Sequence, residues 1–265
     1  MIIHFRKMQG LGNDYLYVYG EVPDNIAALS QKLSDRHFGA GSDGMIYISS
    51  SDKADFKMRI FNADGSEAEM CGNGIRCVGK YVYDKGYTDK THLTVETLSG
   101  IRTLDLQIRG GKVRSATVGM GKVIVGEETE IVAAGQTFVG IPVSVGNPHF
   151  VIFVPDAETA PLKTAGPQIE NHPSFPGGVN AEFVQVTGDN KLRMRVWERG
   201  SGVTMACGTG ACAAAAAAVH KGLCRSGVPV SVQPDGGTLE IRVDPAGFVL
   251  MTGPAETVYQ GETII

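Results

Sequence analysis

The sequence contains one stretch of 18 residues twice, and this duplication restricts the possible folds more than any other feature. Residues 57–74 read KMRIFNADGSEAEMCGNG and residues 193–210 read RMRVWERGSGVTMACGTG, which align without a gap. Two more pairs recur in the same order: GLGNDYLYVYG with SVGNPHFVIFV, and FGAGSDGMIYI with FPGGVNAEFVQV. Chance similarity between glycine-rich loops would not preserve both order and spacing. We therefore interpret the chain as two homologous halves.

Each half repeats one pattern of strands and helices. Alternation of apolar and polar residues predicts strands in segments such as YLYVYG, DFKMRIFN, HFVIFV and LRMRVWE. Long helices are predicted over 72–85 and 208–221, each ended by glycine, and further helices over 25–36 and 159–170. The segment ACAAAAAAVHKG has so few polar residues that we expect a sheet to surround this helix.

The predicted fold class is therefore α+β, with two homologous pseudo-symmetric domains. Each domain is expected to be a mostly antiparallel, β-barrel-like sheet around a central helix. The segment TVYQGETII follows the last strand of the second half and is expected to return to the first half. We predict a first domain of residues 1–118 plus 257–265 and a second of residues 119–256, with the active site in a cleft between them.

Composition and charge exclude several classes of function. The formal net charge is −4 and lysine and arginine form no cluster, so nucleic acid and anionic membranes are not expected partners. No apolar run is long enough to span a bilayer, and the MIIHF start does not resemble a secretion signal. Five cysteines in a chain of 265 residues do not suggest a disulfide scaffold. We expect a cytoplasmic protein with free thiols.

The duplicated Cys-Gly-x-Gly places a cysteine at the start of a helix in each half. The exposed amides of a helix N-terminus bind anions, and the same field lowers the pKa of a cysteine there. A pseudo-two-fold axis would bring both helix starts to one cleft, with Cys71 and Cys207 on either side of a bound carboxylate. Such a pair of thiols could invert an amino-acid α-carbon: one removes its proton and the other returns a proton to the opposite face.

Other interpretations of the cysteines remain open. A single cysteine in such a motif is more often a small core residue, and we assign Cys77, Cys212 and Cys224 to packing. Spacings of six and five residues on a helix do not suit shared zinc ligation, so no metal is expected. A redox disulfide between Cys71 and Cys207 would block the site.

The chain resembles the cofactor-independent diaminopimelate epimerases of lysine and peptidoglycan biosynthesis along its whole length. GLGNDY, FNADGSEAEMCGNGIR, VGNPHFV, GVNAEFV, VWERG and ACGTGACA occur in the family's order and spacing. The resemblance implies epimerisation of LL- to meso-diaminopimelate without a cofactor, with Cys71 and Cys207 as the acid/base pair. It also implies that His149 and Glu198 assist proton movement, that Glu198 contacts substrate, and that the enzyme is a homodimer.

By the same resemblance, the α-carboxylate of the reacting centre lies at the two helix starts, at Gly72, Asn73, Gly208 and Thr209. The opposite end of the substrate is expected at Asn13, Asn62, Asn147, Asn180 and Arg199. Asparagine both donates and accepts, and arginine pairs with carboxylate through two parallel hydrogen bonds, which suits an asymmetric end. Taken singly, each asparagine would more often serve a turn than a substrate.

The sequence departs from the family pattern where Val203 replaces a glutamate and near Gly44, where some members carry glutamine. Two alternatives follow. One is a related cofactor-independent racemase, similar to the histidine or proline racemases, although Asn73 stands where proline racemases carry histidine. The other is a two-lobed amino-acid binding protein, which would have no need for two equivalent cysteines.

Overall fold

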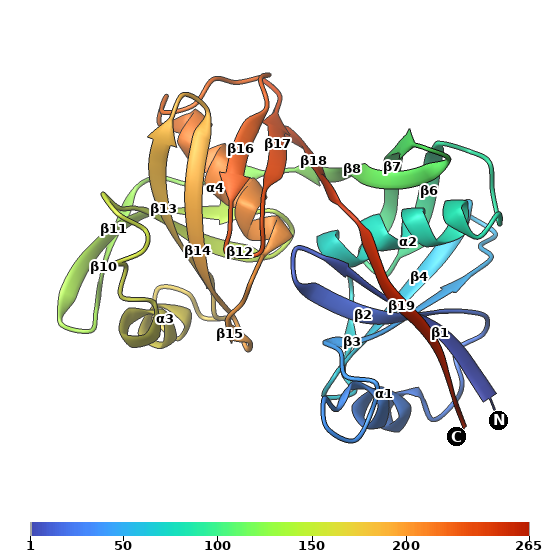
Figure 1. Ribbon diagram of the computed structural model, residues 1–265. Helices are drawn as coiled ribbons and strands as arrows, with labels where there is room; N and C mark the ends of the chain where they lie inside the picture. Colours follow the sequence, from blue (N-terminus) through green and yellow to red (C-terminus); the bar gives the residue numbers. More distant parts are fainter. Residues whose placement is uncertain (1, 265) are drawn as a thin grey trace. The chain divides into compact units, whose positions relative to one another are not determined.

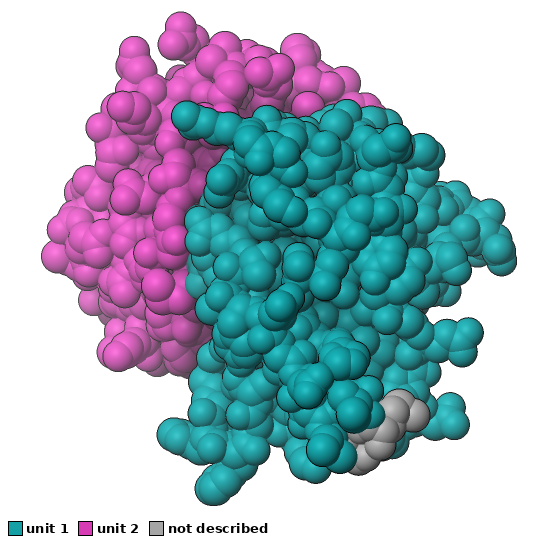
Figure 2. Space-filling view, turned by 45° about the vertical axis from the view of Figure 1, so that its right-hand side comes forward, with its two compact units in different colours: residues 1–118, 253–265 teal, residues 119–252 magenta. Residues whose placement is uncertain are grey.

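The structure, a computed structural model, describes residues 2–264 of the chain. The chain divides into two compact units: unit 1 (Met1–Val118 and Gly253–Ile265) and unit 2 (Gly119–Thr252), coloured separately in Figure 2. The chain passes from one unit to the other within strand β8 (Lys112–Lys122) and returns within β18 (Phe248–Pro254). The return to unit 1 at Gly253 begins slightly earlier than residue 257, where the sequence placed it.

Unit 1 is a mixed sheet whose neighbouring strands run in the order β19-β1-β2-β3-β4-β6-β7-β8. The β2–β3 and β4–β6 pairs are parallel and the other pairs in this order are antiparallel. Helix α1 joins β2 to β3, and α2 lies between β4 and β6 in the chain (Figure 1). The elements are β1 (Ile2–Gly10), β2 (Asn13–Tyr19), α1 (Ile26–Ser34), β3 (Gly44–Ser49), β4 (Phe56–Asn62), β5 (Glu67–Ala68), α2 (Gly72–Asp84), β6 (His92–Thr97), β7 (Gly100–Arg109) and β19 (Glu256–Ile264).

Unit 2 repeats this plan, in the order β10-β11-β12-β13-β14-β16-β17-β18. Again two pairs, β12–β13 and β14–β16, are parallel and the rest in this order are antiparallel. The elements are β9 (Ile124–Val125), β10 (Thr129–Ala133), β11 (Gln136–Ser144), β12 (Pro148–Phe153), α3 (Leu162–Glu170), β13 (Asn180–Gly188), β14 (Lys191–Glu198), β15 (Gly202–Val203), α4 (Gly208–His220), β16 (Val230–Gln233) and β17 (Leu239–Val243).

The repeated order and strand directions confirm the predicted two-domain α+β fold. In each unit a helix lies in the connection between the two strands of each parallel pair: α1 and α2 in unit 1, α3 and α4 in unit 2. Parallel strands need such a long connection, which is usually a helix. The alanine-rich α4 packs against strands on several sides, including β11, β12, β14 and β17, and residues 213–218 of this helix are almost fully buried. Small side chains allow this because they let the surrounding sheet approach the helix axis closely.

The helix predicted over 159–170 begins later, at Leu162. Pro161 occupies its N-cap and residues 158 and 159 form a turn, so the hydrogen-bonded helix is shorter at its start than the predicted one. Both helices that follow the cysteines begin at the glycine predicted, Gly72 and Gly208. Within residues 2–264, none of the helices combines the length and apolar character needed to cross a bilayer.

Candidate active site

Cys71 is the N-cap residue of α2 and is half-buried. Its backbone is extended, and the Gly74 N–H donates a hydrogen bond to its sulfur at 3.3 Å. On the other side, the thiol donates to Asn13 Oδ1 at 3.2 Å. The sulfur thus has an acceptor for its protonated form and a donor for its thiolate form.

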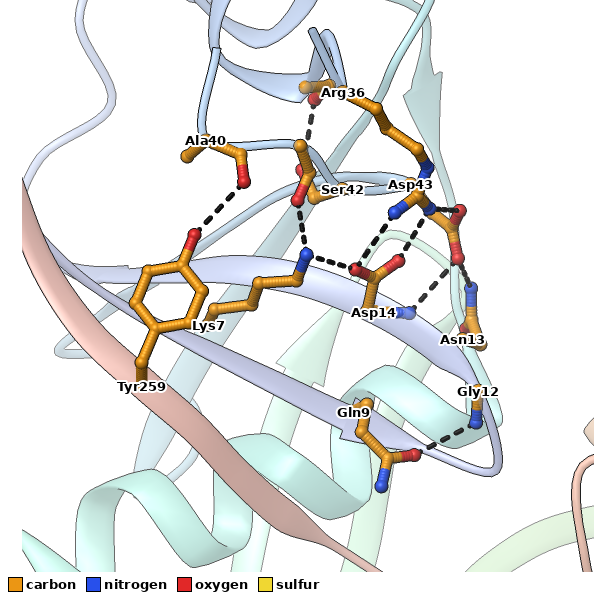
Figure 3. A network of polar contacts seen from close by, with 12 residues as sticks. Lys7, Gln9, Gly12, Asn13, Asp14, Arg36, Ala40, Ser42, Asp43 and Tyr259 are labelled. Atoms are coloured by element: carbon orange, nitrogen blue, oxygen red, sulfur yellow. Dashed lines mark hydrogen bonds and ion pairs between the residues drawn. The ribbon is translucent and has the colours of Figure 1, made fainter.

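The orientation of Asn13 is fixed by a charged network in unit 1 (Figure 3). Its Nδ2 donates to Asp43 Oδ2 at 2.8 Å, and because a carboxylate only accepts, Oδ1 must be the atom turned to the sulfur. Arg36 Nη2 contacts both Asp43 Oδ1 at 2.9 Å and Asp14 Oδ1 at 2.8 Å, and Lys7 Nζ lies 2.7 Å from Asp14 Oδ2. Burial raises the pKa of Asp14, but hydrogen bonds from Arg36 and Lys7 outweigh it, so the net pKa is lowered.

Cys207 caps α4 in the same way but is more deeply buried, with 6% of its surface exposed. The Gly210 N–H donates to its sulfur at 3.3 Å, and Thr209 Oγ1 lies 3.5 Å from it. The first turn of α4 therefore presents its amides on the same side as the thiol, as α2 does. Each unit by itself has a cysteine at the start of a helix, as the sequence predicted.

A chain of polar groups leads away from Cys207, from the partly buried Thr209 and Asn147 to the fully buried His149 and Glu182. Asn147 Nδ2 donates to Thr209 Oγ1 at 3.3 Å, and Asn147 Oδ1 lies 3.1 Å from His149 Nε2. His149 Nδ1 lies 2.6 Å from Glu182 Oε1, and both side chains are completely buried. A Cβ at Gly210 would lie only 2.7 Å from Glu182 Oε1, so glycine at this position lets the carboxylate approach the helix start.

Glu198 lies at the end of β14 and accepts a hydrogen bond from Thr204 Oγ1. Burial raises the pKa of Glu198, and the negative charge of Glu182 raises it further, while hydrogen bonds with Thr204 and Cys207 act in the opposite direction. Glu198 and Cys207 each shift the pKa of the other, so the two groups are neighbours in unit 2. The structure thus joins Glu198, Cys207, Thr209, Asn147 and His149 in one polar cluster of unit 2.

The surroundings of Cys207 favour its protonated form. Burial raises its pKa well above the ordinary value, and the negative charges of Glu198 and Glu182 raise it further; hydrogen bonds from Thr209 and Gly210 only partly offset this. Cys77, by comparison, is fully buried on α2 and burial raises its pKa to about 11, which fits a packing role.

Replacing Glu198 by glutamine is expected to make Cys207 more acidic. The substitution removes a negative charge that disfavours the thiolate, so the pKa of Cys207 should fall by roughly one unit. The measurement is the rate of alkylation by iodoacetamide against pH, followed for the Cys207 peptide by mass spectrometry. Glu240→Gln, at an exposed position on β17 of the same unit, is the control. A midpoint that stays in place or rises in Glu198→Gln would contradict the electrostatic account.

The remaining predicted binding residues differ in their surroundings. Asn62 donates from Nδ2 to Ser66 Oγ at 3.0 Å, within the β4–β5 hairpin, as an asparagine in a turn commonly does. Asn180 joins two segments, because its Oδ1 accepts from the Arg199 N–H at 2.9 Å and its Nδ2 donates to Pro148 O at 2.9 Å. The exposed Arg199 donates from Nη1 to Gly177 O at 2.7 Å. Gly72, Asn73 and Gly208 are buried in the first turns of their helices.

Sequence reasoning did not single out Glu182, Asp43 or Thr204. Glu182 carried the clearest signal, since a lone carboxylate in the apolar strand AEFVQV must find a partner if the strand is buried. The identity of that partner depends on the parallel pairing of β12 with β13, which no local pattern reveals. Asp43 and Thr204 lie in polar loops, where a functional side chain looks like any other.

The two departures from the family pattern have structural explanations. Val203 pairs with Trp197 in the β14–β15 hairpin and its side chain is exposed, so backbone bonds order this loop. Gly44 has φ +156°, and a Cβ there would lie 2.2 Å from the Phe61 carbonyl oxygen. No other residue fits this backbone without a shift in β4.

Comparison with solved structures identifies the fold class. The chain is similar to a phenazine biosynthesis protein of the PhzF family from Bacillus anthracis, with a TM-score of 0.77, 16% identity and full coverage of both chains. It is also similar to a probable proline racemase from Agrobacterium radiobacter, with a TM-score of 0.76, 17% identity, and coverage of 99% of this chain and 93% of the other. At such identities the likeness shows the fold, a two-domain α+β fold shared by these proteins.

The family follows from the sequence comparisons. The family model described as diaminopimelate epimerase matches residues 5–125 and 141–258. A diaminopimelate epimerase of Bacteroides thetaiotaomicron is 54% identical, over 98% of this chain and 97% of its own length. The chain belongs to the diaminopimelate epimerase family, and it is therefore an enzyme of the isomerase class that acts on a small molecule.

Proposed function

We propose that the chain converts LL- to meso-diaminopimelate by a two-base mechanism without a cofactor, in the synthesis of lysine and of peptidoglycan precursors. The observation that carries this proposal is the presence, in each unit, of a cysteine at the N-cap of a helix with an amide N–H on its sulfur at 3.3 Å. The name shared by the family model and the curated relatives supports the substrate.

In this mechanism one thiolate removes the α-proton and the other thiol protonates the opposite face of the same carbon. The reaction therefore requires both sulfurs to reach one α-carbon in the substrate complex. The amides at the starts of α2 and α4 stabilise the charge that develops on the α-carboxylate as the proton leaves. Carbon–hydrogen bond cleavage leaves the electron pair on the substrate carbanion, and reprotonation restores the charge balance.

The surroundings of Cys207 suit a protonated starting state. Glu198 and Glu182 keep Cys207 protonated, so we assign it as the proton donor when Cys71 acts first as base. His149 and Glu198 assist by exchanging protons with Cys207 between turnovers. After one turnover Cys71 is a thiol and Cys207 is a thiolate. His149 and Glu198 return a proton to Cys207, and Cys71 releases its proton, so that the site regains its starting state.

The opposite end of diaminopimelate is assigned to Asn13, Asn62, Asn147, Asn180 and Arg199. Among these, Arg199 is the natural partner for the distal carboxylate, because its guanidinium presents paired donors. Its contact with Gly177 O fixes the side chain over the loop that precedes β13 while leaving it exposed. Asn180 contributes by holding the Arg199 backbone in place.

The experiment that tests this function is a substrate panel in D₂O. The purified chain is incubated with LL-diaminopimelate, histidine and proline, and deuterium at the α-carbon is followed together with formation of the opposite isomer. Epimerisation of diaminopimelate is expected to be much the fastest, and unchanged after EDTA dialysis and hydroxylamine treatment. Faster racemisation of histidine or proline would show that the alternative racemase function is the correct one.

Arg199→Ala provides the second part of this panel. Loss of a charged hydrogen-bonded contact to the distal carboxylate should lower kcat/KM for diaminopimelate by about 10- to 100-fold. Arg225→Ala, at an exposed arginine of the same unit, is the matched control and should leave kcat/KM unchanged. An Arg199→Ala enzyme with the parent's kcat/KM would remove this residue from the binding set.

A further inference from the structure

Tyr15 occupies in unit 1 the position that His149 occupies in unit 2. The repeated segments GLGNDYLYVYG and SVGNPHFVIFV align Asn13 with Asn147 and Tyr15 with His149. The sheets agree, because Leu16 pairs with Met45 across β2–β3 while Phe150, its counterpart, pairs with Ala181 across β12–β13. Both aromatic side chains thus lie two residues beyond an asparagine that contacts the helix start.

The partner of His149 has no counterpart in unit 1. By the same register, Ile46 stands where Glu182 stands in unit 2, since Tyr17 pairs with Ile46 and Val151 pairs with Glu182. Ile46 covers Gly74 as Glu182 covers Gly210: a Cβ on either glycine would lie 2.7 Å from that side chain. Unit 1 has therefore replaced the buried histidine and carboxylate by a tyrosine and an isoleucine.

The face of β2 that carries Tyr15 is directed at the first turn of α2. Alternate residues of a strand share a face, so Asn13, Tyr15 and Tyr17 lie on one side of β2. Asn13 Oδ1 lies 3.2 Å from Cys71 Sγ, and Tyr17 donates from its hydroxyl to Gly74 O at 3.2 Å. Tyr15 lies between these two contacts, and only 6% of its surface is exposed.

The packing around Tyr15 holds its ring in this place. A Cβ at Gly44 would lie 3.0 Å from Tyr15 Cε1, so the absence of a side chain at Gly44 makes room for the ring. The electrostatics agree with a phenol beside the sulfur. Burial raises the pKa of Tyr15 well above its ordinary value. The charges of a Cys71 thiolate and of Asp43, and the interaction with the Cys71 sulfur, raise it further, while a hydrogen bond with Asn13 acts in the opposite direction. Tyr15 therefore keeps its proton and acts as a donor.

We propose that Tyr15 donates a hydrogen bond from its phenol hydroxyl to Cys71 Sγ and thereby favours the thiolate form of this cysteine. Together with the Gly74 N–H it stabilises the sulfur when it is negative, whereas Asn13 Oδ1 accepts from it when it is a thiol. Tyr15 retains its proton throughout and transfers none. The significance of this contact for catalysis rests on the proposed role of Cys71 as an acid/base residue.

The test compares Tyr15→Phe with Tyr17→Phe in the full chain without substrate. Both substitutions remove one buried hydroxyl and keep the ring, but only Tyr15 is proposed to contact the sulfur. The measurement is the pH dependence of iodoacetamide alkylation at Cys71, resolved by peptide mass spectrometry. In Tyr15→Phe the midpoint should rise by roughly one pH unit, with about a tenfold slower reaction below it, while Tyr17→Phe follows the parent. Coincident midpoints for Tyr15→Phe and the parent would overturn the proposal.

A second measurement, the pH dependence of kcat/KM, tests the Tyr15–Cys71 contact separately from the proposed role of Cys71 as the base. If Cys71 is the base, the lower limb of the pH profile of kcat/KM should move upward by the same amount in Tyr15→Phe. A shifted alkylation midpoint without a shifted kinetic limb would uphold the Tyr15–Cys71 contact and count against Cys71 as the base. Thermal unfolding of both variants near the parent's temperature verifies that the comparison concerns folded protein.

Discussion

Epimerisation is expected to be abolished when either Cys71 is replaced by serine or Cys207 by alanine. A general acid or base contributes about 10²- to 10⁴-fold to a rate, and inversion needs one on each face of the carbon. Cys71→Ser keeps an N-cap oxygen for the Gly74 N–H, so α2 should remain intact. Cys207→Ala loses its cap at a cost of about 1 kcal/mol, which a domain of this size tolerates. The measurement is kcat for conversion of LL- to meso-diaminopimelate.

The remaining thiol gives this experiment its specificity. A variant with one working base should still exchange the α-proton of one isomer with D₂O, but without inversion, because no acid serves the other face. Cys77→Ala is the control, since this thiol is also on α2 but fully buried in the core. It should lose stability and retain kcat. Near-parental turnover by Cys71→Ser or Cys207→Ala would refute the two-base assignment.

The sequence was sufficient to predict the fold because a duplicated chain contains each strand and helix pattern twice, so one copy can be checked against the other. Two independent copies of each strand and helix pattern agree, and the starts of α2 and α4 are fixed by glycine and cysteine at equivalent positions. The predicted start of α3 was less accurate, because the helical hydrogen bonds begin only at Leu162, after Pro161, whereas the sequence placed the helix start at residue 159.

The sequence could predict only those site residues whose position follows from the local structure around them. The cysteines qualify, because an N-cap cysteine is recognisable from its motif. Asp43 and Glu182 do not, since each acts by orienting another side chain brought close by strand pairing. The repeat still contains a signal of its own: at residues that differ between the halves, such as Tyr15 against His149, we expect the two cysteines to have different surroundings.

Replacing His149 by phenylalanine is expected to be among the most destabilising substitutions in the chain. Glu182 would then be a carboxylate with no exposed surface, and its Oε2 already has no hydrogen-bond partner among the described residues. Removing one member of a buried ion pair costs about 3–5 kcal/mol. For a protein of this size each kcal/mol corresponds to roughly 2–4 °C, so Tm should fall by about 6–20 °C in thermal unfolding. Activity should fall with it, because His149 orients Asn147 toward Thr209.

A double-mutant cycle with Glu182→Met separates loss of packing from loss of the contact between His149 and Glu182. Glu182→Met alone removes the buried carboxylate and leaves His149 with Asn147 Oδ1, so its cost should be smaller than that of His149→Phe. The variant with both substitutions should unfold at a higher temperature than His149→Phe, because no unpaired carboxylate remains. It should nevertheless stay as inactive as the single variants, since apolar side chains restore packing but cannot pass a proton to Cys207. Additive effects on Tm would show that the pair is not coupled, and recovered activity in the double variant would show that the pair serves stability alone.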